Sequence, residues 1–334
     1  MEFGKWWVED KEQKVRCKLC PHHCLISPGK SGICNVRKNN DGQLYSLVYG
    51  HPAALNVDPI EKKPLYHFYP GSRALSIGTV GCNLTCKFCQ NWQLARGEFR
   101  KQRQAMSPEE IVKLARKKSC DSIAFTYNEP TIFGEYLLDI SKIAHQQDIK
   151  TIMVTNGFIT EEAVNDIYPN IDAANVDIKF FTDELYREYT GGRLQAILDA
   201  ILAMQKHGTF IEITNLIIPE LNDSPKEFKK FINWIKENLG EETPLHLSAF
   251  HPAYKMKDHP STSKSQLDTL YEIAKEQGLK YIYEGNVRSD EHNNTYCPAC
   301  GNLLIERSYF SVTKNNIKVG HCECGKGINV VDQH

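Results

Sequence analysis

The chain has 334 residues, and its 40 lysines and arginines almost balance its 41 aspartates and glutamates, for a formal net charge of −1. A chain of this length can bury a large core and allows one large domain with small attachments. The balanced charge supplies no field that would draw the chain onto nucleic acid or an anionic membrane, so we expect neither as a partner.

The N-terminal sequence carries no recognisable targeting signal. Residues 1–14 are charged and lack the apolar core of a secretory signal, and no apolar run approaches the about 18 residues of a membrane helix. We therefore expect a cytoplasmic protein. Its 12 cysteines form three groups, with Cys120 alone outside them. In a reducing compartment such groups indicate metal sites, and Cys120 is expected to be a small buried residue.

Residues 1–70 are expected to form a cysteine-rich N-terminal module. Four cysteines lie close together in it, namely Cys17, Cys20, Cys24 and Cys34. Gly29 and Gly32 allow the tight turns that would bring the last sulfur back to the other three. Four thiolates fit either zinc or a second, fully ligated 4Fe–4S cluster. A role without metal stays open because the spacing matches no common zinc knuckle, and His22 and His23 are alternative ligands.

The next stretch, Asp58 to Phe68, is rich in proline and charge and ends before Pro70-Gly71. Prolines and a Pro-Gly pair at these positions are typical of a linker or of a loop against the following domain. We interpret its Glu61-Lys62-Lys63 run as a solvent-exposed face.

Residues 71–290 alternate short apolar strands with segments of helical periodicity. The expected strands are 74–80, 122–127, 150–155, 173–178, 210–218, 245–250 and a shorter one at 280–284. Ser107-Pro108 and Ser224-Pro225 mark helix starts, and Gly208 and Gly278 fall where helices should stop. Repeated strand and helix predict a parallel sheet with right-handed crossovers. The segment is shorter than the about 250 residues of a full eightfold barrel, so we expect an α/β partial (β/α)6 TIM-like barrel.

Three cysteines follow the first of these strands in a CxxxCxxC arrangement, as Cys82, Cys86 and Cys89. A 4Fe–4S cluster normally takes four thiolates, and the next cysteine, Cys120, is about 30 residues away, so one iron would keep an open position. Alternatively, the three cysteines are zinc ligands or reduced thiols that bind no metal. Zinc sites, however, usually contain cysteines paired as CxxC and have four ligands.

Polar residues occur at the ends of the following strands. They are Tyr127-Asn128-Glu129, Thr155-Asn156-Gly157, Asp177-Ile178-Lys179, Asn215 and His251. Ligands of parallel sheets bind at the carboxyl ends of strands, so these groups are expected around one site.

Residues 291–334 carry two further cysteine pairs, Cys297 with Cys300 and Cys322 with Cys324, each pair followed by glycine. They predict a small zinc-ribbon-like or rubredoxin-like module with structural zinc, iron being the alternative. So small a module could not fold on its core alone.

The cysteine spacing, with Phe88 just before the last cysteine, resembles the signature of radical S-adenosylmethionine (SAM) enzymes. The resemblance implies that the open iron chelates SAM, which one electron cleaves to methionine and a 5′-deoxyadenosyl radical that takes hydrogen from substrate. Partial (β/α)6 barrels are common in that superfamily. It also implies an anaerobic oxidoreductase-type enzyme with a ferredoxin-type or flavodoxin-type electron donor.

The same resemblance suggests roles for individual residues. The Asn128-Glu129-Pro130 element is similar to the Gly-Gly-Glu-Pro of the superfamily, which makes Glu129 the acceptor for the SAM ammonium and Asn128 its neighbour. Asp177 and Lys179 resemble the Asp-x-Lys of glycyl-radical-enzyme activases, which helps to position SAM, and a structural salt bridge is the alternative.

The aromatic position and two asparagines complete these expectations. Phe88 and Asn91 would form the adenine wall, and Asn156 is a weaker candidate for a ribose or substrate contact. No residue is nominated as catalytic.

Taken whole, the chain resembles the AmmeMemoRadiSam-system radical SAM proteins, relatives of pyruvate-formate-lyase activating enzymes. That resemblance implies a Memo-like or AMMECR-like partner. We expect a radical SAM enzyme with an unidentified substrate. A glycyl-radical-enzyme activase is the first alternative, and a non-enzymatic metal-binding scaffold or nucleic-acid adaptor is the second.

Overall fold

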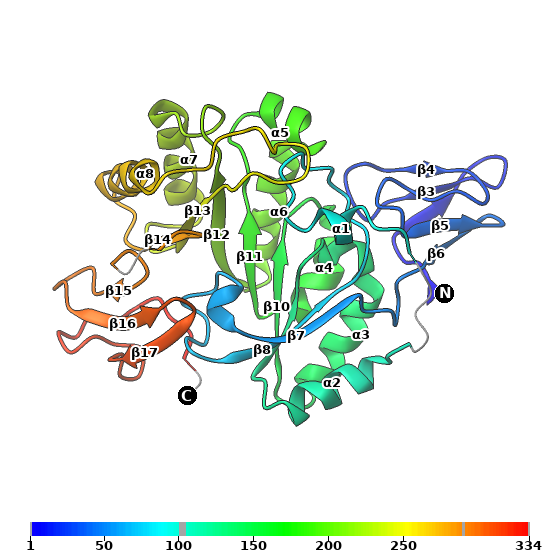
Figure 1. Cartoon of the computed structure of the whole chain (residues 1–334). Coiled ribbons are helices and arrows are strands. Elements are labelled where there is room, and N and C mark those ends of the chain that lie inside the picture. The colour runs from blue at the N-terminus through cyan, green and yellow to red at the C-terminus, as the bar shows by residue number, and fades with distance from the viewer. Residues whose placement is uncertain (1, 100–104, 289–290, 333–334) are drawn as a thin grey trace.

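A computed structural model describes residues 2–99, 105–288 and 291–332. Figure 1 shows a central sheet with helices packed along it, the N-terminal strands (blue) on one side and the C-terminal strands (orange and red) on the other. Among the described residues, no helix combines the length and the apolar character needed to cross a membrane.

Within the described part of the chain, the central sheet has eight strands in the order β14-β13-β12-β11-β10-β9-β8-β7. Its strands are β7 (Ala54–Pro59), β8 (Arg73–Gly78), β9 (Ser122–Phe125), β10 (Lys150–Thr155), β11 (Ala173–Asp177), β12 (Phe210–Ile217), β13 (Leu245–Ala249) and β14 (Ile282–Gly285). Strands β8 to β14 are parallel, and β7 pairs antiparallel with β8. The expected class of six β/α units is confirmed, with β14 in the place of the shorter strand expected at 280–284 and only β7 added beyond the prediction.

Helices connect the parallel strands. Their bounds are α1 (Trp92–Ala95), α2 (Pro108–Lys117), α3 (Gly134–His145), α4 (Glu161–Ile167), α5 (Asp183–Thr190), α6 (Leu194–Lys206), α7 (Pro225–Asn238) and α8 (Lys264–Glu276), with 3-10 turns η1 (Ile60–Lys62), η2 (Pro130–Phe133) and η3 (Tyr168–Asn170). Ser107 and Glu110 form the expected capping box at α2. Gly208 and Gly278 follow α6 and α8 with φ of 78° and 97°, as helix ends require.

The N-terminal residues form two small sheets beside the central one. Their strands are β1 (Glu2–Phe3), β2 (Trp7–Glu9), β3 (Val15–Cys17), β4 (Leu25–Ile26), β5 (Arg37–Asn40) and β6 (Gln43–Ser46), paired as β1-β6-β5 and β2-β3-β4. Arg37 anchors this region, because its guanidinium donates to Glu135 of α3 at 2.8 and 2.9 Å while both side chains are buried.

The C-terminal region contains a three-stranded antiparallel sheet. Its strands are β15 (Thr295–Tyr296), β16 (Leu303–Ser308) and β17 (Ser311–Asn315). This region docks onto the segment before β8, since Val331 exchanges backbone hydrogen bonds of 2.8 Å with His67 and Tyr69, and Arg307 donates to Tyr66 O at 2.7 Å.

Asp58 to Phe68 is a loop packed against the following domain, one of its two predicted forms, but the prediction of a solvent-exposed Glu61-Lys62-Lys63 face was wrong for Glu61 and Lys63, and only Lys62 is exposed. Asp58 lies in strand β7, next to its last residue, and Glu61 and Lys63 are only 1% and 2% exposed. The segment turns into the interior and binds a buried carboxylate there, since Glu212 of β12 accepts from the backbone N–H of Tyr66 at 3.0 Å and of His67 at 2.7 Å. Buried charges need partners, and here Lys63 pairs with Asp58 at 2.8 Å while Arg307 of the terminal sheet lies 3.8 Å from Glu61, a contact that the local sequence does not reveal.

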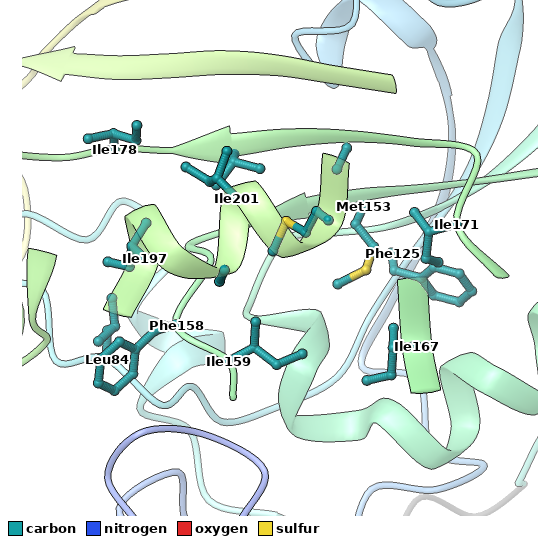
Figure 2. Close-up of a cluster of buried hydrophobic side chains, with 14 of the residues drawn as sticks. Leu84, Phe125, Met153, Phe158, Ile159, Ile167, Ile171, Ile178, Ile197 and Ile201 are labelled. Carbon is teal, nitrogen blue, oxygen red and sulfur yellow. The ribbon is translucent and has the colours of Figure 1, made fainter. Parts of the chain in front are cut away.

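The main core lies between the sheet and its helices. Figure 2 shows part of it, with Met153 from β10, Ile167 from α4 and Ile197 from α6. Leu84, which lies between the first two cysteines of the central motif, belongs to the same buried cluster. The cysteine loop is therefore anchored in the core.

Candidate active site

The cysteine loop leaves the carboxyl end of β8 and folds back as a tight structure. Gly81 has a φ of 95°, a conformation that favours glycine, and its N–H donates to Leu94 O at 2.9 Å. Arg96 Nη2 closes the loop from the other side by donating to Cys82 O at 2.8 Å and Leu84 O at 2.5 Å. The three cysteines are thus held by backbone contacts within one short segment.

One pocket of about 300 Å³ lies at the carboxyl ends of the parallel strands. Predicted residues that line it are Cys82, Cys86, Cys89, Phe88, Asn91, Asn128, Glu129, Asn156, Asp177 and Lys179. Strands β8 to β11 and their loops contribute these side chains, so the expectation that the strand ends converge on one place agrees with the geometry.

The surroundings of the three thiols in this pocket raise their pKa values. Desolvation raises the pKa of Cys86 to about 12, with Lys179 opposing that rise, and desolvation also raises the pKa values of Cys82 and Cys89. The Leu84 N–H lies 3.4 Å and the Asn156 Nδ2 3.8 Å from Cys82 Sγ. Soft, desolvated sulfurs that receive N–H donors suit an iron–sulfur cluster, whose irons would keep the thiolates deprotonated.

Glu129 is a buried carboxylate with most of its hydrogen-bonding capacity in use. Oε1 accepts from Thr131 N, Thr131 Oγ1 and Thr155 Oγ1 at 3.0, 2.7 and 2.7 Å, and Oε2 accepts from Asn156 N at 2.8 Å. Burial raises the pKa of Glu129, and these donors oppose the rise. The carboxylate also caps η2, is only 2% exposed and lines the pocket. A further donor could reach only Oε2.

Asp177 and Lys179 form an ion pair at the pocket wall, with Nζ to Oδ2 at 3.0 Å. Their exposed fractions of 28% and 14% leave part of each side chain open to the pocket. The backbone between them is fixed, because Asn222 Nδ2 donates to Lys179 O at 2.9 Å and Asn215 Nδ2 to Ile178 O at 2.6 Å. Asn215, one of the polar residues expected around the site, thus holds the wall in position.

The asparagines expected near the cofactor bind the protein itself. Asn128 accepts from Thr79 N at 3.0 Å and donates to Gly81 O at 2.9 Å, which ties the second strand end to the cysteine loop. Asn156 donates to Asn83 Oδ1 at 3.0 Å. Asn91 donates to the Tyr127 carbonyl at 2.8 Å, and Phe88 packs edge-on against Phe180 at 5.8 Å.

Several pocket residues were not nominated from the sequence, namely Thr126, Thr214, Leu216, Ser248 and Asn286. Strand alternation could have found two of them, since Thr214 and Leu216 are two positions apart on β12 and face the same side. Thr214 Oγ1 is buried and has no hydrogen-bond partner among the described residues. His251, the residue predicted at this edge, is exposed and contacts Asn286 O at 2.9 Å.

The four C-terminal cysteines form a compact set. Cys297 Sγ lies 3.7 Å from Cys324 Sγ and Cys300 Sγ lies 3.6 Å from Cys322 Sγ, and all four sulfurs lie within 4.8 Å of one another. Metal–sulfur bonds of about 2.3 Å in a tetrahedron separate the sulfurs by about 3.8 Å. The set therefore has the size of a site for one tetrahedral ion.

Comparison with known proteins agrees with this geometry. The model of the Radical SAM superfamily matches residues 76–235. An uncharacterised protein of Methanocaldococcus jannaschii is 42% identical over 99% of this chain and 100% of its own length. The pyruvate formate-lyase-activating enzyme of Clostridium pasteurianum is 28% identical over 62% of this chain and 92% of its own. A crystal structure of a radical SAM methyltransferase from Sphaerobacter thermophilus has the same fold, with a TM-score of 0.51, 16% identity and 71% of both chains covered.

Proposed function

The chain belongs to the radical SAM superfamily, and from that premise we propose that it cleaves SAM reductively and uses the resulting radical to abstract hydrogen from a substrate still to be identified. The observation that carries the proposal is the convergence of three cysteines, a buried carboxylate and an ion pair in one pocket at the strand ends.

Cys82, Cys86 and Cys89 would hold the 4Fe–4S cluster. The pocket lining contains no fourth cysteine among the described residues, which leaves one iron for an outside ligand. When bound, the cluster supplies the electron that breaks the sulfonium bond. The chain's own part is to shape the site: Asn156 donates toward the Cys82 sulfur, and Arg96 holds the loop closed.

The remaining pocket residues would bind SAM. Glu129 Oε2 is the acceptor left for the SAM ammonium, because Oε1 already accepts three hydrogen bonds. Lys179 would pair with the SAM carboxylate while Asp177 keeps it in place. Phe88 would bound the adenine side, and the asparagines Asn91, Asn128 and Asn156 would act by positioning these groups.

A more specific activity belongs to the proposal as well. The similarity to a pyruvate formate-lyase-activating enzyme supports a glycyl-radical activase as the alternative, in which case the substrate would be a glycine of a partner protein. The resemblance to AmmeMemoRadiSam-system proteins supports a Memo-like or AMMECR-like partner instead. Either way, a ferredoxin-type or flavodoxin-type donor would supply the electron, and we propose the cytoplasm as the compartment.

We further propose three parts for the chain: an N-terminal module over residues 1–70, a barrel over 71–290 and a zinc-binding ribbon over 291–334. In this division β7, although it precedes residue 71, completes the edge of the barrel sheet.

The decisive experiment measures 5′-deoxyadenosine released from SAM by anaerobically purified, dithionite-reduced protein. We expect release by the wild type and none by Cys86→Ala. If wild-type protein with a full complement of iron releases none, the enzymatic proposal is wrong and the metal-binding scaffold or nucleic-acid adaptor becomes the better explanation. Radical transfer to a purified glycyl radical enzyme, detected by electron paramagnetic resonance (EPR), would select the activase.

A further inference from the structure

The four N-terminal cysteines line one small cavity. Cys17, Cys20, Cys24 and Cys34 line it together with apolar side chains from both the N-terminal module and the barrel, namely Leu19, Ile26, Ile33 and Ile132. A β-carbon added at Gly32, which lies between Cys24 and Cys34, would stand 3.4 Å from Cys24 Sγ. The chain therefore folds around this cavity closely, with its sulfurs turned inward.

The spacing of these sulfurs differs from that of the C-terminal set. In the ribbon all four sulfurs lie within 4.8 Å of one another, the size of a site for a single ion. The described N-terminal sulfurs do not form such a set, although they share one cavity. Thiolates bound to four different irons of a cube lie further apart than thiolates bound to one ion. Within one chain, the wider set fits a cluster and the tighter set fits zinc or a single iron.

A buried hydrogen-bond donor lies at this cavity. Arg37 lines it, is 1% exposed, and has an Nε–H without a hydrogen-bond partner among the described residues. A buried, unpartnered donor is costly unless something accepts from it, and an anionic cluster with sulfide and thiolate acceptors would do so.

From these observations we propose that Cys17, Cys20, Cys24 and Cys34 bind a second 4Fe–4S cluster, with one thiolate on each iron. Its place is fixed by contacts between the module and the central cysteine loop. A β-carbon at Gly81 would stand 2.5 Å from Cys34 O, and His22 Nε2 lies 2.8 Å from Asn83 O. Asn83 lines the N-terminal cavity while its neighbour Cys82 lines the SAM pocket, so the two clusters lie on either side of the same loop.

The test is the iron, sulfide and zinc content of the anaerobically purified full chain, together with the EPR spectrum after reduction. We expect about eight irons in the wild type and about four in Cys86→Ala, whose N-terminal module is untouched and whose reduced EPR signal is that of a 4Fe–4S cluster. Cys20→Ala should lose the other four irons. Cys300→Ala should lose only the ribbon metal, and Cys120→Ala, which removes a buried cysteine outside the three groups, should lose none.

Two results would overturn the proposal: Cys86→Ala protein without iron and sulfide, or a zinc ion that disappears specifically in Cys20→Ala. Because Cys86→Ala leaves all four N-terminal thiols in place, it decides the question even if Cys20→Ala fails to fold. The iron content and the EPR spectrum are also measured independently of SAM cleavage. Protein that keeps about four irons in Cys86→Ala but never releases 5′-deoxyadenosine in the wild type would contradict the proposed activity alone.

Discussion

Replacing Glu129 by glutamine tests whether this buried carboxylate both fixes the pocket and binds SAM. Four donors converge on it, three on Oε1 and one, the Asn156 N–H, on Oε2. Glutamine has the same shape but a single acceptor oxygen. If that oxygen accepts from the three donors, the amide NH2 takes the place of Oε2 and faces the Asn156 N–H. In the wild type, Oε2 accepts from Asn156 N at 2.8 Å.

The structure sets the size of the expected effect. One buried backbone N–H loses its acceptor, which costs about 1–3 kcal/mol, and the other three hydrogen bonds lose the help of the negative charge. We expect Glu129→Gln to lower the free energy of unfolding by about 2 kcal/mol and the thermal midpoint by a few °C. Loss of a charged acceptor for the SAM ammonium should weaken SAM binding by about 10- to 100-fold.

The assays are thermal unfolding and equilibrium binding of SAM to cluster-loaded protein. Glu162→Gln, an exposed glutamate in the first turn of α4, is the matched control and should change neither quantity. If Glu129→Gln unfolds and binds SAM like the wild type, the reasoning is refuted. Loss of stability with unchanged SAM affinity would mean that Glu129 acts only as the cap of η2.

Three further predictions concern the pocket wall, the barrel and the ribbon. Lys179→Met should weaken SAM binding by about tenfold, because it removes the cation proposed for the SAM carboxylate; unchanged affinity would show that the Asp177 ion pair is structural. Burial acts to raise the pKa of Asp172, but donors from His145, Thr151 N–H and Lys150 lower it to about 2. The contribution of ionised Asp172 to the free energy of unfolding should be fully present above about pH 4 and should vanish as the pH falls through about 2. Asp172→Asn should therefore destabilise by about 2 kcal/mol in urea unfolding at pH 7, and a difference that did not shrink below pH 4 would argue against this cause. Cys300→Ala should lose one metal ion per chain and make residues 291–332 sensitive to protease, since metal binding supplies on the order of 10 kcal/mol to such small modules; limited proteolysis with metal analysis checks this, and a ribbon that stays resistant without metal would contradict it.

The arrangement of strands and cysteines followed from local pattern. Each of the seven strands expected between residues 74 and 284 is present, because buried parallel strands are continuous apolar runs separated by helices of clear period. The convergence of Glu129, Asp177 and Lys179 with the cysteines in one pocket followed from the rule that parallel strands share a carboxyl edge. The compact C-terminal set of sulfurs likewise agrees with the spacing of its two pairs.

What side chains do within that pocket was less predictable. Asn128 and Asn215 hold backbone carbonyls of neighbouring segments, and a sequence pattern does not show whether an amide faces a ligand or the chain. The segment with Glu61 and Lys63 was predicted to be exposed to solvent, because charged side chains usually lie at the protein surface. Lys63 pairs with Asp58, five residues earlier, but the partner of Glu61 is Arg307 of the terminal sheet, which only folding brings near.

By itself, therefore, the sequence determined the order of strands and helices, the three sets of thiols and the edge of the sheet at which chemistry is expected. Those features depend on period, turn residues and short spacings, which act within a few residues of one another. The tertiary structure alone decided how many lone pairs Glu129 keeps free, that the N-terminal sulfurs share a cavity without the close grouping of the C-terminal set, and that this cavity adjoins the loop of Cys82. Such properties arise from contacts between distant parts of the chain, whose geometry is set by the packing of the whole core.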